Sequence, residues 1–169
     1  MANTAFPDFD YALPTLEGFI DTSWKNDVCP SLTREADDAN QTLILWCDYA
    51  NEAKRDYEGG KRFTLVKGAY GDADNQTTLC ASDDLADIRL ALKIDAATQD
   101  EVRESMVRFT VGVLRRASDW QEGQDALSNH VVFGPWFRNV YGDMEDGITS
   151  DMQAVIHDAE ERLGDDLPY

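Results

Sequence analysis

The feature that most limits what this chain can fold into is a run of apolar and small residues at alternating steps of four and three. The run extends without a miss over Leu32, Ala36, Ala39, Leu43, Trp46, Ala50, Ala53 and Tyr57. This spacing is typical of one face of an α-helix. With Ser31 as the N-cap and Gly59-Gly60 at the end, the helix would be about 39 Å long at the standard rise per residue. We therefore expect a long central helix here.

The middle of this segment also fits a second interpretation. The residues from Leu43 to Cys47 are all apolar, as in a strand that is buried on both faces. A break in the helix near Asn40 would leave room for such a strand. The sequence therefore leaves helix and strand both open for Leu43 to Cys47.

Two segments with strand-like alternation follow the run. They cover residues 61–70 and 76–81 and are rich in residues that favour strands. Between them, residues 71–75 (Gly-Asp-Ala-Asp-Asn) have the composition of a turn. Two alternating segments joined by a short turn are the usual pattern of a β-hairpin, and we expect one here.

Capping residues and apolar spacing predict the remaining helices. Thr98 and Glu101 form a capping box in front of an apolar stripe that continues toward Gly123. Further helices are expected over residues 15–24, from Ser82 onwards, after Pro135, and from Ser150 to Gly164.

The predicted fold class is α+β. We expect one helix-rich domain over residues 1–169, with one long central helix, a β-hairpin and about four further helices. Residues 1–14 contain two prolines and form an irregular lead-in, and residues 165–169 form a short acidic tail.

Cysteine use and hydropathy bear on the compartment. The three cysteines are widely separated and contain no C-x-x-C pair, so we expect buried thiols instead of a disulfide framework or a zinc site. The chain has no run of eighteen apolar residues, and its first residues lack the pattern of a secretion signal. We therefore expect a cytoplasmic location and no membrane partner.

Motifs for catalysis or cofactor binding are missing from the sequence. It contains no G-x-S-x-G, H-E-x-x-H, phosphate-loop or G-x-G-x-x-G motif, and only two histidines. We expect a protein that is not an enzyme and that has no cofactor and no metal site. A small enzyme with a carboxylate-based or divalent-metal site is an alternative, with Asp72, Asp74 and Asp83 as its first candidates.

The strongest functional signal is a formal net charge of -18, from 33 acidic and 15 basic residues. Such a charge favours partners that are positively charged. The acids gather in one stretch around the expected hairpin turn and in another toward the C-terminus, and an aromatic segment precedes the second stretch. The predicted partner-binding residues are Asp72, Asp74, Asp83, Asp84, Asp87, Trp136, Phe137, Asp143, Glu145, Asp146, Asp151, Asp158, Glu161 and Asp165.

The last helix alone carries too little charge to imitate DNA. From Asp151 to Asp165 it would rise about 21 Å with five acids and one base, or about one net charge per 5 Å, whereas duplex DNA carries about one per 1.7 Å. Imitation of DNA therefore requires the two acidic stretches to share one face, and a homodimer is one way to lengthen that face.

A short part of the chain resembles a stretch of one class of plasmid antirestriction proteins. The resemblance lies in Tyr57-Glu58-Gly59-Gly60, the expected hairpin and residues 82–88, about a fifth of the chain. The Asn-Gly-Gly-aromatic element of those proteins is missing, because Lys67-Gly68-Ala69-Tyr70 stands in its place. A helix end followed by a hairpin produces the same pattern, so no family is assigned.

Taken together, these features predict a non-enzymatic acidic protein that occupies a basic, normally nucleic-acid-binding surface of a partner protein or complex. Phage and mobile-element counter-defence inhibitors, such as anti-CRISPR and antirestriction proteins, work in this way, some of them as DNA mimics. Direct binding of nucleic acid is not expected, because both partners would be negative. A cytoplasmic protein adapted to high salt is the other alternative, since lysines are scarce.

Overall fold

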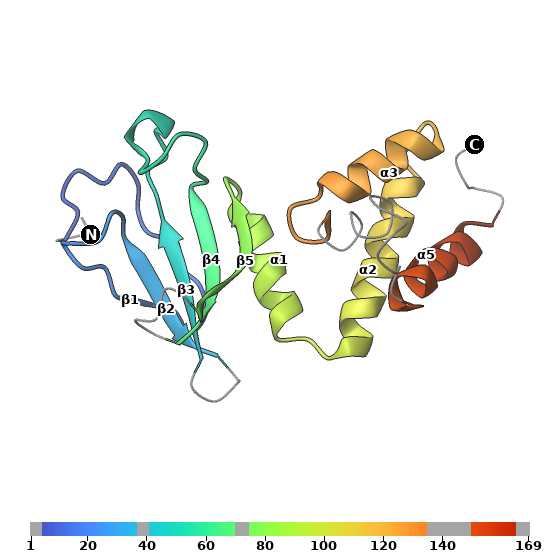
Figure 1. The fold of residues 1–169 in the computed structure, drawn as a ribbon, viewed down its shortest axis with the longest axis horizontal. Coiled ribbons are helices and arrows are strands. Elements are labelled where there is room, and N and C mark those ends of the chain that lie inside the picture. Colours follow the sequence, from blue (N-terminus) through green and yellow to red (C-terminus); the bar gives the residue numbers. More distant parts are fainter. Residues whose placement is uncertain (1–4, 37–40, 70–74, 135–149, 165–169) are drawn as a thin grey trace. The chain divides into compact units, whose positions relative to one another are not determined.

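A computed structural model describes residues 5–36, 41–69, 75–134 and 150–164 of the chain (Figure 1). The contacts within the chain divide it into two units, Met1–Leu92 and Lys93–Tyr169. The first unit contains the strands, and the second contains most of the helical residues. The expectation of a single domain stays a prediction, because two units of this kind can belong to one domain.

The first unit is built on a five-stranded antiparallel sheet (Figure 1). Its strands are β1 (Ile20–Asp21), β2 (Ser31–Glu35), β3 (Thr42–Cys47), β4 (Phe63–Gly68) and β5 (Thr77–Ser82). They lie side by side in the order of the sequence, so each strand pairs with the next one along the chain. Only a β-bulge between Leu65 and Val66 interrupts the register of β4 and β5.

One face of the sheet forms a large part of the core of this unit. Leu32 on β2, Leu45 on β3 and Leu65 on β4 are register partners, and all three are buried. Residues of the N-terminal segment pack at the end of this face. Tyr11 contacts the ring of Phe63 edge-on at 6.2 Å between centroids, and its hydroxyl donates to the Asp48 carbonyl at 2.8 Å. The segment expected as an irregular lead-in therefore helps to cover the sheet.

The opposite face of the sheet carries the alternate residues of the same strands. Ser31, Trp46 and Thr64 are register partners across β2, β3 and β4, and the Trp46 and Thr64 side chains are partly exposed. Because successive side chains of a strand point to opposite faces, Trp46 lies on the face opposite Leu45 and Cys47, and at this end of β3 that face is partly exposed.

The expected long central helix is wrong. Its residues form β2, β3 and a short 3-10 helix, η1 (Glu52–Lys54). The helical spacing of the apolar residues is real, but the backbone of β3 pairs with β2 on one side and β4 on the other, which satisfies its hydrogen bonds along the whole strand. The strand interpretation of Leu43 to Cys47 is therefore confirmed.

The helix expected over residues 15–24 is also wrong. This segment contains turns and β1, which pairs with β2 through Ile20 and Thr33. The two segments of the expected hairpin do pair, as β4 and β5, but they belong to a larger sheet. The architecture is thus a five-stranded antiparallel sheet and a helical part, which is an α+β arrangement without the predicted central helix.

The described helices are α1 (Leu85–Asp95), α2 (Gln99–Leu114), α3 (Trp120–Asn129) and α5 (Ser150–Leu163). The predicted capping box of α2 is confirmed: the Glu101 N–H donates to the Thr98 hydroxyl at 3.3 Å, and the Thr98 N–H donates to the Glu101 carboxylate at 2.9 Å. In the second unit, α2 packs against α3 and α5. None of the described helices is long and apolar enough to cross a membrane.

Candidate functional site

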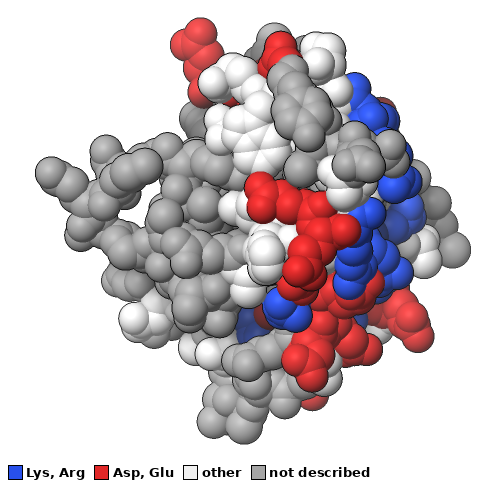
Figure 2. Space-filling model, turned by 90° about the vertical axis from the view of Figure 1, so that its right-hand side faces the viewer, with Lys and Arg blue, Asp and Glu red and all other residues white. Residues whose placement is uncertain are grey.

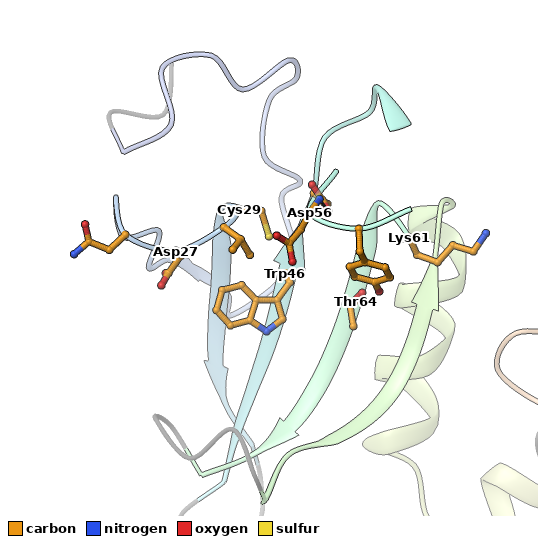
Figure 3. Close-up of a pocket in the computed structure, with 10 residues that line it drawn as sticks. Asp27, Cys29, Trp46, Asp56, Lys61 and Thr64 are labelled. Atoms are coloured by element: carbon orange, nitrogen blue, oxygen red, sulfur yellow. Dashed lines mark hydrogen bonds between the residues drawn. The ribbon is translucent and has the colours of Figure 1, made fainter. Parts of the chain in front are cut away.

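The first unit contains a hollow of about 430 Å³ at one end of the sheet (Figure 3). The segment between β1 and β2 and the loop between β3 and β4 contribute most of its lining. We call it the Trp46 hollow. The lining side chains that matter for its chemistry are Asp27, Val28, Trp46, Asp48, Asp56 and Tyr57.

The strands position the floor of the hollow. Trp46 and Thr64 are register partners on β3 and β4, and both line the hollow. The Trp46 side chain is partly exposed there, so part of its aromatic surface is open to a ligand. Figure 3 shows this indole below Asp56 and Cys29.

Asp48 is the most buried charged group in the lining. Only 8% of the residue is exposed, and its carboxylate accepts the N–H of Tyr49 at 2.7 Å and the N–H of Asp56 at 3.3 Å. Within the described ranges, no basic side chain forms an ion pair with this carboxylate. A buried charge that lacks a counter-charge is costly, so a cation that entered the hollow would gain a strong partner.

Two more carboxylates add negative charge to the hollow. Asp27 and Asp56 both line it, and neither forms an ion pair with a base of the described part. Lys61 is the basic side chain of the lining, but its ammonium pairs with Asp83 at 3.0 Å. Figure 3 shows Lys61 directed away from the Trp46 indole. The hollow therefore has a net negative character.

Arg55 holds the loop that forms one wall. Its side chain is only 6% exposed and donates to the Tyr49 carbonyl at 2.9 Å and to the Gly60 carbonyl at 2.6 Å. It also pairs with Asp83 at 2.8 Å. The hydrogen bond from Lys61 to Asp83, with the Arg62 N–H and the charge of Arg55, lowers the pKa of the Asp83 carboxyl. These bonds fix the wall before any ligand binds.

Exposed apolar side chains stand at the rim. Val28 is 62% exposed and Tyr57 is 61% exposed, and both line the hollow. Exposed apolar groups gathered around a concave surface are typical of a binding site.

The predicted acids next to α1 have structural partners. Asp83 forms the two ion pairs described above. The Asp84 carboxylate accepts the Ala86 N–H at 2.8 Å, and the Asp87 carboxylate accepts the Ser82 hydroxyl. All three therefore stabilise the connection between β5 and α1, which leaves them less open to a partner than the hollow acids.

The predicted acidic ridge on α5 is partly neutralised. Asp158 pairs with Arg103 at 2.7 Å, and Glu161 lies 3.4 Å from His157. Arg162, on the same helix, pairs with Glu104 at 2.8 Å. On the face shown in Figure 2, Lys and Arg side chains lie directly beside Asp and Glu side chains. Their alternation makes this surface a weaker imitation of a phosphate backbone than the sequence indicates.

The other predicted partner-binding residues fall outside the described residues, so their predicted role stays a prediction. They are Asp72, Asp74, Trp136, Phe137, Asp143, Glu145, Asp146 and Asp165. Asp151 belongs to α5, but its side chain is outside the described part.

The negative charge is divided equally between the two units. Residues 1–92 contain 17 acids and 8 bases, and residues 93–169 contain 16 acids and 7 bases, so each unit has a formal net charge of -9. The sheet unit is therefore as acidic as the helical unit.

The cysteine thiols contribute no nucleophile to the hollow. Cys29 lines it, and burial together with the charge of Asp48 raises the pKa of this thiol to about 12. Burial likewise raises the pKa of Cys47 to about 12 and that of Cys80 to about 11. All three are buried and free. A thiol with such a pKa stays protonated near neutral pH and is a poor nucleophile and metal ligand.

Neither ligand clusters nor known proteins identify a reaction for this site. Among the described residues, no group of three or more His, Cys, Asp or Glu side chains is arranged to hold a metal ion. No protein-family model matches the chain, and neither curated proteins nor solved structures show a significant match to it.

Sequence reasoning missed the Trp46 hollow. Its carboxylates come from Asp27, Asp48 and Asp56, which are single acids outside the two acidic stretches. One signal was present: Asp48 directly follows the apolar run of β3, and an acid at the end of a buried strand lies at the edge of the sheet. The pairing of β2 with β3 then brings Asp27, from the segment before β2, to the same hollow as Trp46 and Asp48.

Proposed function

We propose that this chain is a non-enzymatic acidic protein that binds a basic surface of a partner protein and acts in the cytoplasm. The observation that supports the proposal best is the Trp46 hollow, where Asp27, Asp48 and Asp56 lack basic partners among the described residues. Asp83 and Asp158, by contrast, are paired with arginines and lysines. The hollow thus gathers several carboxylates without basic partners in the described part around one concave surface.

The partner surface that fits best is one that normally binds nucleic acid. Such surfaces carry Lys and Arg side chains arranged for phosphates, and an acidic protein that covers them excludes the nucleic acid. The net charge of -18 speeds the approach of the two proteins, and the hollow supplies a specific contact once they meet. A counter-defence inhibitor of a nucleic-acid-guided or restriction complex would work in this way.

A competition assay tests the proposal. Nona-lysine is first bound to a fluorescein-labelled duplex of about 20 base pairs, and the chain is then added while the anisotropy of the duplex is followed. We expect the chain to take up the peptide and to release the duplex at a lower concentration than poly-glutamate of the same total charge. Release should weaken as salt is raised, because the attraction is between charges.

Matched variants connect the result to the hollow. The double substitution Asp27→Asn with Asp56→Asn removes two charges from the lining and should weaken release about tenfold. The control, Asp8→Asn with Glu17→Gln, removes two charges from exposed positions outside the lining and should have little effect. The proposal is wrong if the chain releases no more duplex than poly-glutamate, or if both double variants lose release to the same extent.

A further inference from the structure

We propose that the Trp46 hollow receives an arginine side chain of the partner, with the guanidinium stacked on the Trp46 indole and paired with the carboxylates around it. This inference rests on the proposed function, because it names the group by which the basic partner is recognised. It commits to one occupant: an arginine on a protein or peptide surface.

The charge of the hollow favours a cationic occupant. Asp48 is nine-tenths buried, accepts two backbone N–H groups and has no basic partner in the described part of the chain. Asp27 and Asp56 add two carboxylates to the same lining. The Lys61 ammonium does not neutralise them, because Asp83 holds it at 3.0 Å.

The aromatic groups favour arginine over lysine. Trp46 presents its indole to the hollow, and Tyr57 stands at the rim. A guanidinium is planar and weakly hydrated, so it stacks on an aromatic face and still donates to carboxylates in its own plane. An ammonium is compact and strongly hydrated, and it would lose more water on entering the same space.

The size and rigidity of the hollow fit a side chain that enters from outside. A volume of about 430 Å³ accommodates one long side chain and leaves room for part of the peptide that carries it. Val28 and Tyr57, both exposed at the rim, offer apolar surface to the methylene stem of an arginine. Because Arg55 already fixes the wall, little ordering is needed on binding.

The experiment compares nona-arginine with nona-lysine, two probes with equal charge. Binding is followed by NMR of the ¹⁵N-labelled chain, in which the Trp46 indole N–H signal is assigned by its loss in Trp46→Phe. We expect this signal to shift on addition of nona-arginine, and nona-arginine to bind about fivefold more tightly than nona-lysine. Equal affinities for the two peptides, or an unmoved Trp46 signal at saturation, would overturn the inference.

Variants test the stacking itself. Trp46→Leu should remove the preference for nona-arginine, while its control Trp24→Leu, which changes an exposed tryptophan outside the lining, should keep it. Tyr57→Ala serves as a second variant with little risk to the fold, because Tyr57 is mostly exposed, and it should reduce the preference about twofold. The inference is wrong if Trp24→Leu and Trp46→Leu reduce the preference for nona-arginine equally. If Trp46→Leu does not fold, Tyr57→Ala decides instead, and an unchanged preference in that variant overturns the inference.

The outcomes separate this inference from the proposed function. If both peptides bind equally well and Asp27→Asn with Asp56→Asn weakens both, the hollow recognises charge alone: the function stands and the arginine inference fails. If neither peptide binds the chain more tightly than it binds poly-glutamate, the proposed function itself fails. If N-acetyl-arginine amide binds as tightly as nona-arginine, the hollow is a site for a small cation, and the partner surface is not its ligand.

Discussion

The Arg55 guanidinium lies 2.8 Å from the Asp83 carboxylate, and this pair joins the loop after β3 to the end of β5. Arg55 is almost fully buried, whereas Asp83 is about half exposed. The pair therefore places a buried cation where it can hold two backbone carbonyls of the loop, and the carboxylate compensates its charge. The wall of the Trp46 hollow depends on this arrangement.

Substitution Asp83→Asn tests this dependence. The change leaves the Arg55 guanidinium without its carboxylate partner, so we expect the free energy of unfolding at pH 7 to fall by about 1 kcal/mol. Urea unfolding followed by circular dichroism measures it. The control Asp8→Asn makes the same charge change at an exposed position and should stay within about 0.5 kcal/mol of the parent chain. Equal losses in the two variants would show that the pair does not stabilise the loop.

The same pair predicts a dependence on pH. The pKa of Asp83 is lowered from the ordinary value of 3.8, so the unfolded chain binds the proton more readily than the folded chain. The stabilisation is therefore complete above about pH 4 and is lost as the pH falls through the lowered pKa. We expect the difference in stability between the parent chain and Asp83→Asn to shrink below about pH 4. A difference that stays constant from pH 7 down to pH 2.5 would contradict this.

The cysteines should be unreactive in the folded chain. With a pKa of about 12 for Cys29 and Cys47 and about 11 for Cys80, the thiolate fraction at pH 8 is very small. We expect labelling by a thiol reagent to be about a thousandfold slower than for free cysteine, and to become fast in urea. Rapid native labelling of Cys29, identified by mass spectrometry, would mean that the hollow exposes this thiol.

Local signals in the sequence predicted the helices better than the sheet. The capping box of Thr98 and Glu101 lies within one turn, so both partners of its two hydrogen bonds can be recognised from the local sequence. The helix that was predicted to continue toward Gly123 ends at Leu114. A new helix begins after Asp119, whose carboxylate caps it by accepting the Glu122 N–H at 2.8 Å. Here one local capping signal outweighed the continuity of the apolar pattern.

The sheet could not be predicted in the same way, because strand pairing is not local. The apolar residues from Leu32 to Tyr57 match a helix in spacing, yet Leu45 is fixed by Leu32 and Leu65 on neighbouring strands. The Trp46 hollow has the same origin: the segment from Asp27 and the loop with Asp56 meet only after β3 has taken its place in the sheet. Acidic stretches are visible in a sequence, whereas a site assembled from single acids is not.

Two glycines in the helical unit should respond in opposite ways to the same substitution. A Cβ at Gly123 on α3 would lie 2.7 Å from a methyl carbon of Leu114, which is buried, so Gly123→Ala should cost about 1–3 kcal/mol. A Cβ at Gly112 on α2 would meet only the end of the Arg116 side chain, at 3.5 Å. Gly112→Ala should therefore stabilise the helix by up to about 1 kcal/mol. Thermal unfolding measures whether each variant is more or less stable than the parent chain. Changes in the same direction for both variants would contradict the close packing of Gly123 against Leu114.

Salt dependence separates a binding protein from one adapted to high salt. Both units carry a net charge of -9. At an ionic strength of about 0.01 M, the repulsion between the negative charges within each unit is screened only beyond about 30 Å. Two features oppose unfolding: the apolar core of the sheet around Leu45 and Leu65 does not depend on screening, and Arg103 and Arg162 pair with acids of the helical unit. We therefore expect a cooperative thermal transition in dilute buffer that rises only a few degrees in about 0.5 M sodium chloride. A chain that lacks a cooperative transition in dilute buffer and gains one in salt would instead support salt adaptation as the reason for its acidity.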